Sequence, residues 1–403
     1  MSTATPPVSE TDVLPRSRAE FLQRFTQGDF GSLRVLITLA VIWLIFALAN
    51  DRFLSAINLT NLALQIAGIG LISVGVVLIL LLGEIDLSVG IVSGLCAAIM
   101  AVLNVKHGWA PVPALAAAIV AGLAIGTFHG FIHTRFGVPS FVVTLAGLLG
   151  WQGVLLWVLG DTGTINLNAP LIVDLAGTFF ADAIGWIIAV VLIAVYAAVT
   201  LSGRMGRVRA GLDAPPVGAL VVRVVAVAVP VLLTVWIVNQ DRGLPLALVI
   251  LVGFVILFDY VTQRTTFGRH IYAVGGNEEA ARRAGIDVRR VRTVVFALGS
   301  MMAACGGIML ASRLLAVNQS SGGSDLLLLA IAGPVIAGTS LFGGRGRVWS
   351  ALLGALVIGS ISNGMDLLAY SSDTKFMVTG AVLLGAVVVD AATSKRRSRA
   401  GRV

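Results

Sequence analysis

Charged residues are scarce in this sequence of 403 residues. Asp, Glu, Lys and Arg together make up 12% of the chain, whereas hydrophobic residues make up 57%. Soluble domains typically carry roughly twice that charged fraction, about 25%. A soluble chain of this size would lack the polar surface needed to cover its core, whereas lipid tails can cover apolar side chains directly. The composition therefore argues against a soluble globular protein and indicates a membrane protein.

Residues that build catalytic or metal centres are also few. Cys96 and Cys305 are the only cysteines and lie within apolar runs, and the four histidines show no ligand spacing, so neither a disulfide framework nor a metal site is predicted. None of the three lysines stands in the Gly-x-x-x-x-Gly-Lys-Ser/Thr pattern of a phosphate-binding loop. We therefore expect no catalytic residues, no bound cofactor and no metal, and we expect that the chain is not an enzyme.

The net charge of +8 is distributed over the ends of apolar segments. A nucleic-acid-binding protein would gather such charge on one soluble face, so no nucleic-acid partner is expected.

Long apolar runs recur along the whole chain. A helix needs about 20 mostly apolar residues to cross a bilayer, and membrane barrels instead use alternating strands of about ten residues. We predict an all-α polytopic membrane protein with about twelve spans, within a range of roughly ten to fourteen. The predicted spans are Val35–Ala49, Leu62–Leu82, Leu87–Val105, Pro111–Ile132, Pro139–Leu159, Ala183–Leu201, Pro216–Val238, Leu244–Val261, Val294–Ala311, Leu326–Leu341, Val348–Leu368 and Phe376–Val389.

Arginine and lysine predict the orientation of these spans. With the N-terminus inside and twelve spans, 22 of the 28 basic residues fall in inside segments, as the positive-inside rule requires. Both termini are therefore predicted to be cytoplasmic. The predicted organisation is an N-terminal tail over 1–32, a transmembrane domain over 33–392 with a charged cytoplasmic loop over 263–293, and a basic C-terminal tail over 393–403.

The loop over 263–293 contains a short predicted helix. Asn277 is a good N-cap, Glu278 suits the first turn, and Gly285 can supply a left-handed stop. Such a short helix is marginal alone in water, so we expect it to pack against something. Two interpretations stay open at this point: an incidental turn in a solvated loop, or a coupling helix that seats in a cytoplasmic motor.

A second polar segment interrupts the apolar stretch between Leu62 and Val105. It contains Glu84, Asp86 and Ser88, and charges near apolar spans are functional candidates because they are costly to keep there. We expect Asp86 to cap the third span and Glu84 to lie at a helix N-terminus. A gating role is the alternative and is compatible with capping.

Three blocks of the sequence follow a recognisable pattern. Residues 83–90 read Gly-Glu-Ile-Asp-Leu-Ser-Val-Gly, and residues 339–346 read Thr-Ser-Leu-Phe-Gly-Gly-Arg-Gly. The third block matches a cytoplasmic-loop pattern at Gly268, Ala273, Gly275, Asn277, Ala280, Ala281, Gly285 and Ile286. Together these blocks resemble the permease subunits of simple-sugar ABC importers, and the resemblance runs from roughly residue 55 to residue 390. Departures are Glu84, where the family has Gly, and residues 332–334.

Within that family the chain is most similar to the xylose-type permeases. Glu84, the run over 139–147 and an extra hairpin over 216–261 carry this finer resemblance. It implies a type II ABC-importer-like fold in a bacterial inner membrane, and a pathway that passes a monosaccharide, xylose, by alternating access. It also implies four kinds of partner: cytoplasmic ATP-binding subunits that hydrolyse ATP, a periplasmic sugar-binding protein, a second permease copy and membrane lipid.

The resemblance also assigns roles to residues. The ATPase-coupling residues that it implies are Gly268, Arg269, Asn277, Glu278, Ala280, Ala281, Gly285 and Ile286. The expected pathway or gating residues are Glu84, Asp86, Ser88, Thr144 and Asn363. For Thr144 and Asn363, a hydrogen bond between helices is the alternative to contact with a passing sugar.

Two other functions stay open. A secondary transporter driven by an ion gradient would need membrane-embedded carboxylates and no ATPase partner. A permease of the same architecture for ribose, a nucleoside or a branched-chain amino acid would differ only in its cargo.

Overall fold

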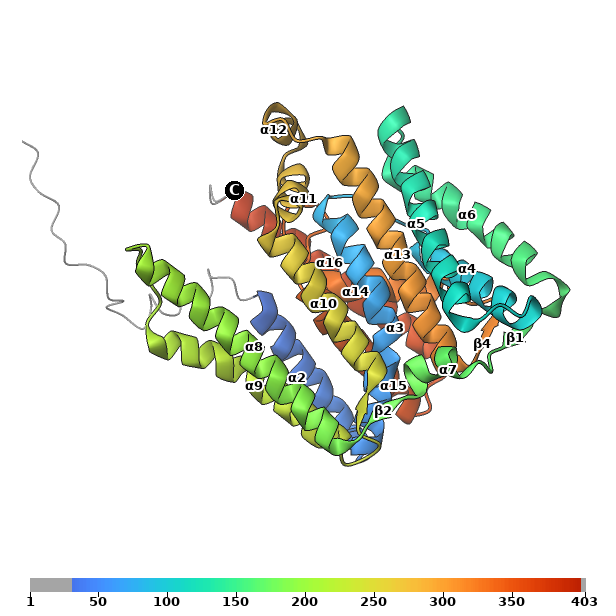
Figure 1. The fold of residues 1–403 in the computed structure, drawn as a ribbon, viewed down its shortest axis with the longest axis horizontal. Coiled ribbons are helices and arrows are strands. Elements are labelled where there is room, and N and C mark those ends of the chain that lie inside the picture. Colours follow the sequence, from blue (N-terminus) through green and yellow to red (C-terminus); the bar gives the residue numbers. More distant parts are fainter. Residues whose placement is uncertain (1–30, 400–403) are drawn as a thin grey trace, which may run out of the picture.

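The computed structural model describes residues 31–399 of the chain. The predicted N-terminal tail over 1–32 therefore lies almost entirely outside the described residues. The structure is mostly helical (Figure 1). Its strands are very short and form two antiparallel pairs, in which β1 (Thr164–Asn166) pairs with β4 (Ala316–Asn318) and β2 (Phe179–Phe180) pairs with β3 (Leu244–Pro245).

Each of the twelve predicted spans overlaps a helix. These helices are α2 (Gly31–Ala49), α3 (Ala56–Leu81), α4 (Val89–Ala101) with its π-helical extension η1 (Val102–Lys106), α5 (Pro111–Phe136), α6 (Ser140–Leu159), α8 (Asp182–Arg209), α9 (Val217–Val238), α10 (Leu246–Arg264), α13 (Val288–Leu314), α14 (Ser324–Ile336), α15 (Trp349–Leu367) and α16 (Ser372–Arg399). Within residues 31–399, nine helices are long and apolar enough to cross a membrane, and α2 and α14 contribute shorter apolar segments. The prediction of a helical polytopic membrane protein is confirmed at this level.

Several predicted boundaries were wrong because polar caps extend the helices. α3 begins at Ala56 because the Ser55 hydroxyl accepts a hydrogen bond from the Asn58 backbone N–H. α13 begins at Val288 because the Asp287 carboxylate accepts one from Arg290. In contrast, α14 ends at Ile336, and Gly338 follows in a left-handed conformation. The described part of the predicted C-terminal tail continues α16 as helix to Arg399.

Helix α3 forms the centre of the molecule. In its most apolar window 83% of the residues are buried, against 11% for α8 and for α9. It packs against α13, α15, α10 and α14, whereas α8 and α9 form a hairpin at one side in Figure 1. An apolar helix surrounded on all sides belongs to the core, and the α8–α9 hairpin is peripheral.

Small residues let α5 pack closely against α13. A Cβ atom at Gly122 would lie 2.7 Å from the Ser300 carbonyl oxygen, and one at Gly126 would overlap the carbonyl oxygen of Phe296. These two glycines thus leave room for the backbone of α13. Close backbone approach of this kind is how helices associate in lipid.

The α5–α13 contact gives a first testable prediction. We expect Gly126→Ala to lower the free energy of unfolding by about 1–3 kcal/mol, because the added methyl meets backbone that cannot rotate away. The matched control is Gly203→Ala in α8, where an added Cβ meets nothing within 4 Å. Thermal unfolding in detergent should give a lower midpoint for Gly126→Ala only, and equal midpoints would contradict the packing described here.

The connecting segments gather at two opposite ends of the molecule. Helices α11 (Thr266–Gly276) and α12 (Glu278–Arg283) lie at one end together with the C-terminal part of α16. Helix α7 (Pro170–Gly177) and the strand β2 lie at the other end (Figure 1). The connection between α6 and β1 contains the 3₁₀ turn η2 (Gly160–Thr162). The end with α11 and α12 carries the loop over 263–293, which the sequence predicts to be cytoplasmic.

Candidate functional site

The three sequence blocks meet at the α12 end of the molecule. The Gly344 backbone N–H donates to the Leu81 carbonyl oxygen at 2.9 Å, which joins the late block to the end of α3. The Tyr272 hydroxyl of α11 donates to the Gly346 carbonyl oxygen at 2.8 Å. A Cβ atom at Gly275 would overlap the Leu81 carbonyl oxygen. Segments far apart in sequence therefore contact one another through their backbones.

The predicted loop over 263–293 is a folded pair of short helices. Thr265 caps α11, and its hydroxyl accepts from the Gly268 N–H at 3.1 Å. The Asn277 side chain caps α12 by accepting from the Ala280 N–H at 2.9 Å. Gly285 follows α12 with φ +81°, the left-handed region that favours glycine. The predicted cap and stop of the short helix are confirmed.

The two faces of α12 differ in exposure. Ala281 is only 4% exposed and packs in the main hydrophobic core, and Ile286 packs against that core from its edge. Ala280 lies on the exposed face. Arg269 of α11 is also exposed, whereas Gly268 is buried against the backbone of α10. Of these predicted coupling residues, Ala280 and Arg269 are therefore available to another chain, whereas Gly268 and Ala281 are not.

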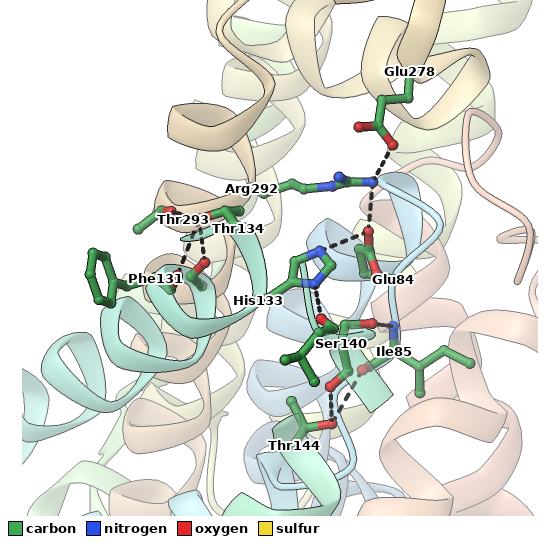
Figure 2. Close-up of polar contacts among 12 residues, drawn as sticks. Glu84, Ile85, Phe131, His133, Thr134, Ser140, Thr144, Glu278, Arg292 and Thr293 are labelled. Atoms are coloured by element: carbon green, nitrogen blue, oxygen red, sulfur yellow. Dashed lines mark hydrogen bonds and ion pairs between the residues drawn. The ribbon is translucent and has the colours of Figure 1, made fainter. Parts of the chain in front are cut away.

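A network of four charged side chains lies beneath α12 (Figure 2). One terminal nitrogen of Arg292, on α13, lies 2.9 Å from Glu84 Oε1 and 2.9 Å from Glu278 Oε2. His133 Nε2, on α5, lies 3.2 Å from the same Glu84 oxygen. The network joins the turn after α3 to α5, α12 and α13.

The partners of these groups indicate their protonation states. His133 Nδ1 lies 2.7 Å from the Val138 carbonyl oxygen, so both of its ring nitrogens face oxygen acceptors. A histidine can donate from both nitrogens only as the cation. With His133 and Arg292 positive and Glu84 and Glu278 negative, the formal charges of the network cancel.

The ionised state of Glu84 is favoured by its surroundings. Burial raises the pKa of the Glu84 carboxyl, whereas hydrogen bonds from His133 and Ser140 lower it. The charge of Arg292 lowers it further, and the net result is a pKa below the usual range. Stability from this ionised carboxylate is therefore present at neutral pH and is lost as the pH falls through the lowered folded-state pKa.

The turn after α3, residues 82–88, is bound to the start of α6. The Leu87 N–H donates to the Thr144 hydroxyl at 3.1 Å, and the Ile85 N–H faces the Ser140 hydroxyl at 3.5 Å. The Thr144 hydroxyl in turn faces the carbonyl oxygens of Ser140 and Ile85 (Figure 2). Thr144 is fully buried, and its hydrogen bonds fix the turn against α6.

Two capping predictions in this turn were wrong. Asp86 does not cap α4, because its Oδ1 accepts from the N–H and hydroxyl of Ser88 at 2.8 and 2.6 Å, both before the helix starts. Ser88 itself occupies the N-cap position and makes no side-chain cap bond. Glu84 follows the end of α3 and lies at no helix N-terminus. The ion network explains its position instead.

A second polar group lies deeper, between α4, α5 and α6. Trp151 Nε1 donates to His129 Nε2 at 2.9 Å, which leaves the His129 proton on Nδ1, 3.5 Å from the Ser88 hydroxyl. Asp86 is 4% exposed, and its Oδ2 has no hydrogen-bond partner among the described residues. Asp86, Ser88 and Thr144 are thus brought together around one turn.

Asn363 is not part of this arrangement. Its side-chain oxygen accepts from Asn58 Nδ2 at 2.8 Å, at the opposite end of α3. Both side chains are buried, and the bond joins α15 to α3. The structure therefore gives Asn363 the interhelical hydrogen bond that was the alternative to a pathway role.

Sequence reasoning did not single out His133 or Arg292. Arg292 was counted only as a positive charge that orients the chain, and His133 was considered only as a possible metal ligand. His129 and His133 are four residues apart on α5 and so share one helix face. Two ionisable residues on one face of an apolar helix indicate a functional site. The spacing of His129 and His133 could therefore have identified this face from the sequence. In residues 31–399 no group of three or more His, Cys, Asp or Glu side chains could hold a metal ion.

Comparison with known proteins agrees with the blocks that meet here. A family model described as "Branched-chain amino acid transport system / permease component" matches residues 58–387. The chain is 37% identical to the xylose transport system permease protein of Escherichia coli K12 over 92% of this chain and 96% of that protein. It is 34% identical to the corresponding protein of Haemophilus influenzae, over 90% and 96%. It is 32% identical to the ribose import permease protein of Escherichia coli K12, over 91% and 95%.

No solved structure matches the chain significantly. The family model covers most of the chain, and the relatives align over nearly their whole length. The chain belongs to the branched-chain amino acid transport system permease family, and it is a multi-pass membrane permease of a bacterial ABC transport system rather than an enzyme.

Proposed function

We propose that the chain forms the translocation pathway of an ATP-driven importer for a monosaccharide, and that the sugar is xylose. The observation that carries the proposal is the capped helix α12, which presents an exposed face where the three sequence blocks meet. The relatives named for xylose transport support the cargo. Transport would proceed by alternating access, without covalent chemistry by this chain and without a bound cofactor or metal.

The proposed assembly contains several chains. A permease of an ABC system works with ATPase subunits and a binding protein, and we propose two ATP-binding subunits that each dock on α12 of one of two permease copies. The α12 end would then face the cytoplasm, together with both termini. A periplasmic sugar-binding protein would approach the opposite end, where α7 and β2 lie. We further propose twelve spans in a type II importer arrangement within the bacterial inner membrane.

Features of α12 suit docking on a motor protein. Its two arginines pair with glutamates one turn earlier: Arg282 lies 2.7 Å from Glu278 and Arg283 lies 3.1 Å from Glu279. The buried Ala281 anchors the helix to the core while Ala280 faces outward. A small residue on the outer face permits close approach of another chain, and an anchored helix can transmit force.

The alternative of an ion-driven secondary transporter is less well supported by the charges. Such a transporter needs a carboxylate that can bind and release an ion within the membrane. Glu84 is already paired with Arg292 and His133, which leaves Asp86 as the candidate carboxylate in this region. A permease for ribose or for a branched-chain amino acid would have the same architecture and would differ from this proposal only in its cargo.

Reconstitution tests the proposed function. The permease is co-purified in mild detergent with its ATP-binding subunit, placed in liposomes, and assayed for ATP hydrolysis with xylose-loaded binding protein, with ribose as the competing sugar. We expect a stable complex whose hydrolysis rate rises with xylose. Uptake driven by a proton or sodium gradient without any ATPase subunit would contradict the proposal, and stimulation by ribose alone would contradict the cargo.

A further inference from the structure

We propose that Arg292 is a positioning residue that links the docking helix α12 to the turn over residues 82–88. The inference rests on the proposed function, because it assigns to this side chain the transmission of α12 movement into the membrane. It gives a role to Arg292, which the sequence analysis did not single out.

Arg292 is placed to connect two separate parts of the molecule. Its side chain is 18% exposed, and a single terminal nitrogen contacts both Glu84 and Glu278 at 2.9 Å (Figure 2). Glu278 is the first residue of α12, and Glu84 belongs to the turn that leaves α3. Charge-assisted hydrogen bonds are stronger than those between neutral groups. A displacement of Glu278 is therefore transmitted to Glu84 through the guanidinium group of Arg292.

Packing does not provide the same connection between α12 and α5. An open pocket of about 420 Å³ lies between the end of α5 and α12, lined by His133, Glu278, Arg282 and Arg292 among others. Side chains therefore do not fill the space across which the two elements face each other. His133, Glu278 and Arg292 of the ion network line this space, while Ala281 anchors the other face of α12 to the core.

The other end of the link reaches α6. His133 holds Glu84 from the α5 side at 3.2 Å, so the carboxylate is fixed between two cations. The same turn is bound to α6 through the Leu87 N–H and the Thr144 hydroxyl. Polar contacts thus run from α12 through Arg292 to Glu84, and the backbone of the turn continues the connection to Leu87 and to Thr144 of α6.

Because the two contacts of Arg292 act in series, the two single variants and the double variant should show a characteristic pattern of activity. Breaking either contact of Arg292 interrupts the same link, so Glu84→Gln and Glu278→Gln should have equal effects that do not add. The quantity to measure is the amount of xylose taken up per ATP hydrolysed in proteoliposomes. We expect about a tenfold loss in each single variant and no further loss in the double variant, since a charge-assisted hydrogen bond shifts an equilibrium by about tenfold or more.

The control is Asp213→Asn. Asp213 is exposed in the connection between α8 and α9, on the peripheral hairpin and outside the docking helix. Its substitution removes one negative charge without touching Arg292 or α12, so sugar uptake per ATP should stay at the wild-type value. Arg292→Met, which keeps the apolar stem and removes the charge, should match the Glu84→Gln variant in this ratio.

The outcomes separate the link from a structural role and from the proposed function. If the network only stabilises the fold, uptake and ATP hydrolysis fall in parallel, the unfolding midpoint drops, and the losses in the double variant add; that result overturns the inference. A wild-type uptake ratio in both single variants also overturns it. If the wild-type protein shows no ATP-dependent uptake at all, the proposed function has failed instead.

Discussion

Gly275→Ala should abolish ATP-driven uptake, whereas Gly276→Ala, one residue later, should leave it intact. A Cβ atom at Gly275 would overlap the Leu81 carbonyl oxygen and lie 2.8 Å from the Gly344 nitrogen. Those two atoms form the hydrogen bond that joins the end of α3 to the late sequence block. The methyl group must therefore break this bond or push α11 away from α3. At Gly276 an added Cβ meets nothing within 4 Å.

We expect the large effect because neither neighbour of Gly275 is a flexible side chain. Overpacking a well-packed region typically costs about 1–3 kcal/mol, and here the methyl group must in addition disrupt the hydrogen bond at the point where three segments meet. Uptake of xylose into proteoliposomes and the yield of monodisperse protein are the two measurements. A fully active Gly275→Ala variant would show that α11 and α3 do not need this close approach.

Ala280→Glu should abolish xylose-stimulated ATP hydrolysis without unfolding the permease. Ala280 lies on the exposed face of α12, so a carboxylate there does not disturb this chain but would be buried, unpaired, when an ATPase subunit docks. We expect at least about a tenfold weaker complex, since burying an unpaired charge costs more than about 1.4 kcal/mol. Co-purification with the ATP-binding subunit and the hydrolysis rate both report the loss.

Ala210→Glu is the control for this experiment. Ala210 is exposed at the end of α8, on the peripheral hairpin and away from α12. Ala281→Glu is unsuitable, because Ala281 is buried in the core and its substitution would test packing within the permease. Normal stimulation in Ala280→Glu, with the complex intact, would mean that the ATPase subunit docks elsewhere.

The helices were largely predictable from the sequence, because a span must be apolar over most of its length. Their ends were less predictable. Ser55 and Asp287 lie outside the apolar runs, yet their hydrogen bonds start α3 and α13 several residues before the predicted spans. Hydropathy indicates which residues can lie in lipid, but it does not detect the local hydrogen bonds that cap a helix.

The candidate site was predictable only in pieces. The short helix α12 follows local rules of capping, so Asn277 and Gly285 were interpreted correctly. The partners of Glu84 could not be found in the same way, because His133 and Arg292 lie 49 and 208 residues further along the chain. Pairing over such separations depends on which helices become neighbours, and a single sequence does not contain that information in any local pattern.

The central place of α3 has a consequence for how the chain is made. Its main neighbours α10, α13, α14 and α15 all follow it in the sequence, so a ribosome must synthesise them long after α3 has entered the bilayer. During that interval α3 is solvated by lipid, which its mean hydropathy of 2.5 permits. A core segment of a soluble protein left waiting in water would be prone to aggregation. In this permease the membrane itself serves as the temporary partner of the helix around which the rest is assembled.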